Sequence, residues 1–322
     1  MNYKISKIAG DASFRKFYRI TLNKKSKIIV FAQKEKYKNL IAYSAINRFL
    51  RHNKILAPKL YSHNYSKGII LIEDFGDNLF HKILIKHKNK LLIYKKLVNL
   101  LLKIQKIKPQ NKVKNINNST HLIEKYSKKH LQRESDLFFK WYLPLVIRKK
   151  KLSGVKKKTR KILSKLYKMI NFPNLHFVHR DYHCENLISV NKKIGVIDSQ
   201  DALIGNPAYD LVSLVDDVRI KTSKNLKKKI YNYYLKKTFL KYRNNSNKFL
   251  EDFNILSVQR SLKIIGIFSR LYRRDKKKKY LKLIPYTWQL LEARLNSKIF
   301  VELKQVLDKN ISKKKRKEIL FK

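Results

Sequence analysis

Hydrophobic and polar positions alternate along the first part of the chain, and this two-residue period is typical of β-strands. The alternation covers residues 15–33 with a polar break in its middle, which predicts an antiparallel hairpin. A helical spacing of apolar residues follows over 40–50, and short apolar runs at 58–61 and 68–73 predict two more strands. Up to about residue 76 the predicted order is therefore strand, strand, helix, strand, strand.

The rest of the chain is dominated by the 3.6-residue period of amphipathic helices. Three long segments carry it: residues 91–107, 137–147 and 155–170. Apolar strand-like runs interrupt the helices over 176–197, and helices resume at Pro207. We therefore predict an α+β protein with a small N-terminal lobe of antiparallel sheet and one helix, residues 1–76, and a larger, mostly helical C-terminal lobe, residues 77–322.

Composition supports a folded protein that is stabilised by packing. The chain has 322 residues, of which 43% are hydrophobic and 11% aromatic, enough for a sizeable core. A single cysteine, Cys184, excludes an internal disulfide framework and a cysteine-based zinc site. No apolar run approaches the roughly 20 residues that span a bilayer, and no apolar leader follows Met1. We expect a cytoplasmic protein.

The net charge is unusually positive, at +55 from 77 Lys and Arg against 22 Asp and Glu. Such a surface attracts polyanions, including nucleic acid. The lysines are spread along the whole chain together with many Ile and Asn residues, which is typical of an A+T-rich genome. We therefore favour a composition bias over nucleic-acid binding, and we expect the charge to speed the encounter with anionic ligands in a salt-dependent way.

One segment carries the polar residues that phosphoryl transfer requires. It reads His-Arg-Asp-Tyr-His-Cys-Glu-Asn over residues 179–186, and Asp198 follows Asn186 by twelve residues. The reaction uses a carboxylate beside the attacking hydroxyl and oxygen ligands that hold magnesium on the phosphates. The pattern predicts that Asp181 orients the acceptor hydroxyl and takes its proton. It predicts Asn186 and Asp198 as the metal ligands.

The apolar runs 187–190 and 194–197 lie between these two metal ligands and predict a short hairpin that brings them together. In a purely structural alternative, the aspartate caps a turn and His179 packs in a core. Cys184 as a nucleophile is a weaker alternative, because the pattern places no base beside it. The complete motif, with apolar strands on both sides, favours phosphoryl transfer.

These segments resemble the aminoglycoside phosphotransferase superfamily, and within it the bacterial anomeric kinases of N-acetylmuramate and N-acetylglucosamine. The resemblance rests on the 179–186 motif, on Gly-Val-Ile-Asp-Ser-Gln-Asp-Ala-Leu-Ile-Gly at 195–205, and on Tyr-Asp-Leu-Val-Ser-Leu at 209–214. Three more stretches extend it over nearly the whole chain, at 9–15, 134–141 and 259–270. The resemblance implies a two-lobed protein-kinase-like fold that uses ATP and Mg²⁺.

The resemblance also implies residues for the nucleotide. They are Gly10, Asp11, Ala12 and Ser13 in a turn that closes over the phosphates, and Glu73, Asp74 and Phe75 in a hinge whose backbone meets the adenine. Small residues in such a turn let backbone N–H groups approach a phosphate, and the Ser13 hydroxyl can donate as well. From the residues alone, an ordinary hairpin turn is an equal alternative.

Candidates for the acceptor side follow from the same resemblance. Gln200 and Asp201 come just after the metal-binding aspartate and are the first candidates for sugar contacts, with Glu134 and Arg260 in second rank. Trp141 has a helical spacing with its apolar neighbours, so core packing explains it at least as well. We interpret Asp210 as a buried structural carboxylate.

The sequence departs from the kinase pattern at two positions. Protein kinases have a strand lysine on the α- and β-phosphates, whereas the apolar run 28–32 contains none and is only flanked by Lys27 and Lys34. Ser199 stands where an aromatic residue usually follows the metal-binding aspartate, and it predicts looser packing there.

We therefore predict a phosphotransferase that acts on the anomeric hydroxyl of N-acetylmuramate or N-acetylglucosamine and feeds cell-wall (peptidoglycan) precursor recycling. One alternative is a kinase of another small hydroxyl compound, such as an aminoglycoside, choline or homoserine. Arg180 and the Asp-Ser-Gln-Asp run disfavour the drug-modifying relatives, which usually have a glycine and a different continuation. The other alternative is a kinase-shaped protein that binds a polyanion without catalysis.

Overall fold

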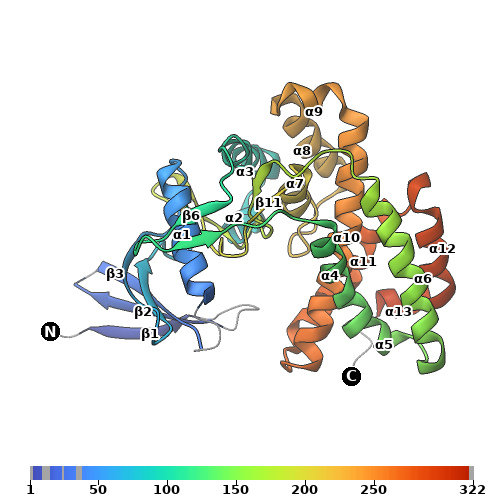
Figure 1. The fold of residues 1–322 in the computed structure, drawn as a ribbon, viewed down its shortest axis with the longest axis horizontal. Coiled ribbons are helices and arrows are strands. Elements are labelled where there is room, and N and C mark those ends of the chain that lie inside the picture. Colours follow the sequence, from blue (N-terminus) through green and yellow to red (C-terminus); the bar gives the residue numbers. More distant parts are fainter. Residues whose placement is uncertain (1–2, 9–14, 24, 34–37, 319–322) are drawn as a thin grey trace. The chain divides into compact units, whose positions relative to one another are not determined.

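The structure is a computed structural model that describes residues 3–8, 15–23, 25–33 and 38–318 (Figure 1). The chain divides into two compact units, which are described separately below. The first comprises residues Met1–Lys125 and Leu175–Ile204, and the second comprises Tyr126–Asn174 and Gly205–Lys322. The segment that carries the predicted catalytic motif thus packs with the N-terminal part of the chain, while a functional lobe boundary near residue 76 stays a prediction.

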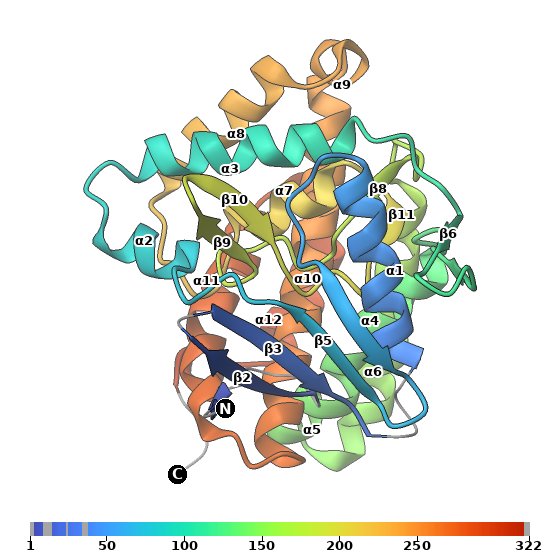
Figure 2. The ribbon, with the colours of Figure 1, turned by 90° about the vertical axis from the view of Figure 1, so that its left-hand side faces the viewer.

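A five-stranded antiparallel sheet in the order β1-β2-β3-β5-β4 forms the N-terminal part of the first unit (Figure 2). Its elements are β1 Lys4–Ile8, β2 Lys16–Leu22, β3 Lys25–Phe31, α1 Lys38–His52, β4 Leu60–Asn64 and β5 Ile69–Glu73. The predicted order of strands and helix is confirmed for β2 to β5. The hydrophobic pattern does not predict β1, because four of its five side chains are exposed.

The alternation along the strands buries one face of this sheet under α1. Val30 of β3 and Ile70 of β5 lie in one apolar cluster with Leu40 and Tyr43 of the helix. Burial of this kind contributes about 25 cal/mol per Å² of apolar surface. The cluster therefore fixes the helix on the sheet and positions the strand ends.

The remainder of the first unit is a helical connection followed by short paired strands. It contains α2 Phe80–Lys86, α3 Lys90–Gln105, β6 Lys112–Lys114, β7 Thr120–Leu122, β8 His176–Val178, β9 Leu187–Val190, β10 Lys193–Val196 and β11 Leu203–Gly205. The predicted helix over 91–107 is α3. The predicted hairpin is confirmed too, since β9 and β10 pair in antiparallel fashion.

The second unit consists of helices. They are α4 Lys128–Leu137, a π-helix Phe138–Tyr142, α5 Leu143–Val146, α6 Lys149–Lys168, α7 Ala208–Val215, α8 Lys224–Lys237, α9 Leu240–Asn244, α10 Ser246–Arg273, a 3₁₀-helix Lys278–Leu283, α11 Ile284–Arg294, a 3₁₀-helix Lys298–Phe300, α12 Val301–Asn310 and α13 Lys313–Lys317. A Cβ atom at Gly266 would lie 2.3 Å from the carbonyl carbon of Leu137, so glycine lets α10 approach the start of the π-helix closely. No helix in the described part of the chain has the length and apolarity to cross a bilayer.

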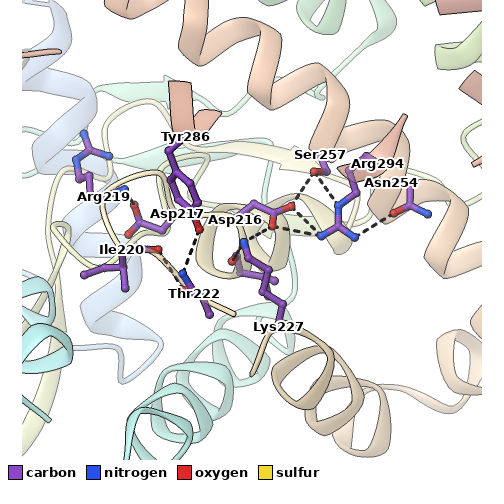
Figure 3. Close-up of polar contacts among 11 residues, drawn as sticks. Asp216, Asp217, Arg219, Ile220, Thr222, Lys227, Asn254, Ser257, Tyr286 and Arg294 are labelled. Carbon is purple, nitrogen blue, oxygen red and sulfur yellow. Dashed lines mark hydrogen bonds and ion pairs between the residues drawn. The ribbon is translucent and has the colours of Figure 1, made fainter. Parts of the chain in front are cut away.

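A buried carboxylate ties four helices of this unit together (Figure 3). Asp216, which follows α7, accepts a hydrogen bond from Ser257 of α10 at 2.7 Å. Its carboxylate also pairs with Lys227 of α8 at 2.7 Å and with Arg294 of α11 at 2.9 Å. Burial alone would raise the pKa of Asp216, but the two cations outweigh burial and lower it.

Replacement of this carboxylate should destabilise the protein in a pH-dependent way. Asp216→Asn leaves Lys227 and Arg294 without their counter-charge, so we expect a loss of about 3 kcal/mol in unfolding free energy at pH 7. Because the folded pKa is depressed, the stabilisation is present above the unfolded pKa of about 3.9 and is lost as the pH falls below it. Urea unfolding at pH 7 and pH 3 measures both effects.

The control is Asp275→Asn, which removes an exposed pair with Arg274. It should change the unfolding free energy by less than about 1 kcal/mol at either pH. If Asp216→Asn and the wild type have equal unfolding free energies at pH 7, the buried network does not stabilise the fold.

Candidate active site

The loop between β8 and β9 is anchored from within by two buried side chains. The ring Nε2 of His179 lies 3.0 Å from the carbonyl oxygen of Ile197, and the Tyr182 hydroxyl donates to the carbonyl of Leu97 at 2.8 Å. Between them Asp181 is only half-buried. Cys184 is 1% exposed, which disfavours it as a nucleophile. The loop therefore presents the aspartate while the residues around it hold the backbone.

The β9–β10 hairpin brings the two predicted metal ligands to the same end. Leu187 pairs with Val196, and the next backbone hydrogen bond runs from the Ile197 N–H to the Asn186 carbonyl at 3.0 Å. The Asn186 amide nitrogen donates to the carbonyl of Asp181 at 2.9 Å. That bond orients the amide, so its Oδ1 atom is the one available to a cation. The geometry joins the loop of Asp181 directly to the hairpin that carries the predicted metal ligands.

Besides the β9–β10 turn, where Asn191 and Lys192 are left-handed, two more non-glycine residues of this region have left-handed backbone conformations. Arg180 has a φ of 72° and Asp198 a φ of 65°. Such conformations cost about 1–2 kcal/mol each for residues with a Cβ atom and cluster at functional sites, where the surroundings impose them. The conformation at Arg180 also agrees with the glycine usual in the drug-modifying relatives, because glycine adopts it without strain.

The donor set suits magnesium. Asn186 offers an amide oxygen and Asp198 a carboxylate that is 38% exposed, and both are hard ligands. Mg²⁺ is commonly bound by one or two protein oxygens together with phosphate oxygens and water. These two residues therefore fit a magnesium ion that arrives with a nucleotide.

Two arginines fix the segment that follows Asp198, the predicted metal ligand. Arg15 pairs with Asp198 and donates to the Gln200 side-chain oxygen at 2.8 Å. Gln200 in turn donates to the Asp201 carboxylate at 2.8 Å, and Arg180 donates to the Asp201 carbonyl at 2.9 Å. The structure thus brings Asp198 together with both first-rank acceptor candidates.

Sequence reasoning gave Arg15 no role. The residue ends the stretch 9–15 that contributed to the family resemblance, and this was the signal that could have identified it. Its partner Asp198 lies 183 residues away in the sequence, so no local pattern predicts the pair.

Ser199 does not leave the loose packing that the sequence predicts. It is fully buried, and its hydroxyl donates to the side-chain oxygen of Asn47 in α1 at 2.7 Å. The Asn47 amide nitrogen in turn donates to the Pro58 carbonyl at 3.3 Å. At this position, where an aromatic residue usually packs, a hydrogen bond therefore holds the smaller serine side chain in place.

The predicted hinge begins with Glu73, the last residue of β5, and its acidic side chains have internal partners. Glu73 accepts from Arg51 at 3.2 Å, and Asp74 accepts from Arg19 at 3.1 Å. Burial would raise the pKa of Asp74, but hydrogen bonds from Arg19, the Gly76 N–H and Ser26 together lower it. These pairs occupy the acidic side chains, and a contact of the hinge backbone with an adenine stays a prediction.

The other predicted residues are placed as follows. Gly10, Asp11, Ala12 and Ser13 lie outside the described residues. Glu134 and Arg260 belong to the second unit. The Glu134 carboxylate is buried, accepts from Gln259 at 2.8 Å and pairs with Lys263 at 2.9 Å. Its internal partners support a structural task, and a sugar contact stays a prediction.

A groove of about 840 Å³ on the second unit holds none of the predicted site residues. Its lining is Gln132, Ser153, Lys156, Lys157, Arg160, Lys161, Ser164, Lys165 and Lys168. Arg160 pairs with Asp136 at 2.8 Å and Lys165 with Glu302 at 3.4 Å. The groove runs along the basic face of α6, and none of the predicted catalytic residues lines it.

Comparison with known families agrees with this geometry. A family described as the phosphotransferase enzyme family matches residues 4–243, about three quarters of the chain. The chain belongs to this family. The enzyme class predicted from the sequence, a phosphotransferase, is thereby confirmed.

Curated relatives of this phosphotransferase share the narrower name. N-acetylmuramate/N-acetylglucosamine kinase of Caulobacter vibrioides is 27% identical over 275 residues, covering 84% of this chain and 74% of that protein. The enzyme of the same name from Neisseria meningitidis is 25% identical over 293 residues, covering 88% and 83%. The resemblance inferred from the motifs is confirmed.

Solved structures confirm the kinase-like fold. An ethanolamine kinase of Plasmodium vivax superposes with a TM-score of 0.62 at 14% identity, covering 91% of this chain and 82% of that one. The aminoglycoside phosphotransferase APH(2'')-Ib, solved with ADP bound, superposes with a TM-score of 0.61 at 14% identity, covering 92% and 94%. At such identities the likeness shows the fold and not the acceptor.

Phe75 of the predicted hinge packs closely against the β9–β10 hairpin. A Cβ atom at Gly195 in β10 would lie 2.9 Å from two ring carbons of Phe75. Gly195→Ala should displace this ring, lower the unfolding free energy by about 1–3 kcal/mol and weaken ADP binding about tenfold. Chemical unfolding and calorimetric titration with magnesium-ADP measure the two effects.

Gly154→Ala in α6 is the matched control, because a Cβ atom there would meet nothing within 4 Å. It should leave ADP binding unchanged and stabilise the helix by up to about 1 kcal/mol. If Gly195→Ala binds ADP with the wild-type affinity, Phe75 does not contribute to nucleotide binding.

Proposed function

We propose that this phosphotransferase is an ATP- and Mg²⁺-dependent kinase of the anomeric hydroxyl of N-acetylmuramate and N-acetylglucosamine. The observation that carries the proposal is the hairpin that aligns Asn186 with Asp198 beside the loop of Asp181. The names of the curated relatives, which match over 84% or more of the chain, support the choice of acceptor. The product would be a sugar 1-phosphate for reuse in cell-wall precursors, made in the cytoplasm.

Asp181 is the proposed catalytic base. The anomeric oxygen attacks the γ-phosphorus, the bond from that phosphorus to the β,γ-bridging oxygen breaks, and ADP leaves with the electron pair. The acceptor proton passes to the Asp181 carboxylate and then to solvent. A hemiacetal hydroxyl is more acidic than an ordinary alcohol, so a carboxylate of ordinary basicity suffices.

Asn186 Oδ1 and the Asp198 carboxylate are the groups that would hold magnesium. When bound, the ion neutralises charge on the phosphates, which is the main electrostatic requirement of phosphoryl transfer. The left-handed backbone at Asp198 and the hydrogen bond of Asn186 to the Asp181 carbonyl fix the ligands before the ion arrives. Such preorganisation avoids rearrangement during the reaction.

Acceptor recognition falls to the segment after the metal ligand. Asp201 is exposed, and its carboxylate can accept hydrogen bonds from sugar hydroxyls, while the Gln200 amide beside it is held in one orientation. Glu134 and Arg260 are the second-rank contacts. For the nucleotide, the proposed contacts are the backbone at Glu73, Asp74 and Phe75 and the turn of Gly10, Asp11, Ala12 and Ser13.

A coupled ADP-release assay tests the reaction and the acceptor together. We expect turnover of magnesium-ATP with N-acetylmuramate or N-acetylglucosamine and none with choline, homoserine or an aminoglycoside. Asp181→Asn keeps the side-chain shape but cannot accept the proton, so kcat should fall by about 10²- to 10⁴-fold. Asp275→Asn, which changes the pair with Arg274 in the second unit, is the control and should turn over at the wild-type rate.

Two results would contradict the proposal. Turnover with choline, homoserine or an aminoglycoside but no amino sugar would move the acceptor assignment to another member of the family. Retention of full activity in Asp181→Asn would remove this residue from the chemistry.

A further inference from the structure

The buried guanidinium of Arg15 contacts Asp198, one of the two proposed metal ligands. The Arg15 side chain is 4% exposed and immediately precedes β2. Its guanidinium carbon lies 5.6 Å from the ring centre of Phe17 and 5.8 Å from that of Tyr43. Aromatic rings at such distances attract a cation and restrict its movement. The position of this charge is therefore defined by packing.

The guanidinium makes two directed bonds to the segment that follows β10. One of its terminal nitrogens, Nη2, pairs with Asp198 through Oδ1, and the other, Nη1, donates to Gln200 Oε1 at 2.8 Å. Asp198 remains 38% exposed, so its carboxylate is held on one side and open to solvent on the other. A metal can use the open side while the arginine keeps its bond.

The same guanidinium sets the orientation of the Gln200 amide. Because the amide oxygen accepts from Arg15, the amide nitrogen points the other way and donates to the Asp201 carboxylate at 2.8 Å. One cation thus joins the metal ligand to both first-rank acceptor candidates.

Strand β3 corresponds to the strand that carries the phosphate-binding lysine in protein kinases, but it offers no cation comparable to Arg15. The central residues of β3 are apolar, and Ile28 and Val30 lie in the core. Lys27, next to them, places its ammonium 4.6 Å from the ring centre of Tyr61. The positively charged partner of Asp198 is therefore Arg15, which immediately precedes β2, and not a lysine of β3.

We propose that Arg15 is a positioning residue that orients Asp198 for the metal ion and Gln200 for the acceptor. The inference rests on the proposed function, because it assigns the ion to Asn186 and Asp198. The planar guanidinium holds its two donor nitrogens at fixed positions, one toward each partner, whereas a lysine would have to reach both acceptors from a single nitrogen atom on a flexible stem. We therefore expect lysine to be a poor replacement here although it keeps the charge. Groups that orient metal ligands typically contribute 10- to 100-fold in metal affinity.

The test is the binding of Mn²⁺ to the full chain with saturating ADP and no acceptor, followed by electron paramagnetic resonance of the free ion. Arg15→Lys should raise the Kd of Mn²⁺ about tenfold or more, while the affinity for ADP in EDTA changes less than about twofold. Arg160→Lys alters an arginine–aspartate pair in the second unit and is the matched control. It should bind Mn²⁺ with the wild-type Kd.

Circular dichroism shows whether the variants are folded. If Arg15→Lys does not fold, Arg15→Gln, which is neutral and can still donate one hydrogen bond, takes its place in the same titration. A folded Arg15 variant with the wild-type Kd for Mn²⁺ overturns the inference and leaves the proposed function intact. A wild type that binds no Mn²⁺ with ADP overturns the proposed function itself.

Discussion

The pairing of β9 with β10 is the constraint on which the site depends. Residues that are twelve apart in the sequence reach the same end of a hairpin because each backbone hydrogen bond fixes the register of the next. A shift by one residue would turn every side chain of a strand to the opposite face. The hairpin is itself tied at both edges, since β-bridges connect Ile188 to Leu79 and Gly195 to Leu56. These bridges explain why so short a pair of strands can define a site.

Around this hairpin, burial and charge have separate tasks. His179, Tyr182 and Ser199 are buried and bond to backbone or side chains within the first unit, which fixes the loops without adding charge. The carboxylates of Asp181 and Asp198 are only partly buried, so both are accessible from solvent. The arginines supply local positive charge at defined atoms, whereas the general excess of lysine acts over longer distances and is screened by salt.

The sequence predicted the elements with a clear period and the residues with a clear motif. The order of elements from β2 to β5 along the chain, helix α3 and the β9–β10 hairpin followed from apolar spacing. The roles of Asp181, Asn186 and Asp198 were inferred from their chemistry and stay predictions. The exposed strand β1 lacks the alternation that marks a strand. The π-helix at Phe138–Tyr142 has an apolar spacing that helical periodicity does not distinguish from an α-helix. Arg15 escaped prediction because its partners are defined only after the chain has folded, and the same holds for the three partners of Asp216.

The central claim is that Asn186 and Asp198 bind the metal ion of a nucleotide beside Asp181. Anomalous diffraction from crystals grown with Mn²⁺ and a non-hydrolysable ATP analogue tests it most directly. The account predicts a manganese peak in contact with Asn186 Oδ1 and the Asp198 carboxylate, with the γ-phosphate on the side of Asp181. A bound nucleotide whose manganese contacts neither residue would contradict it.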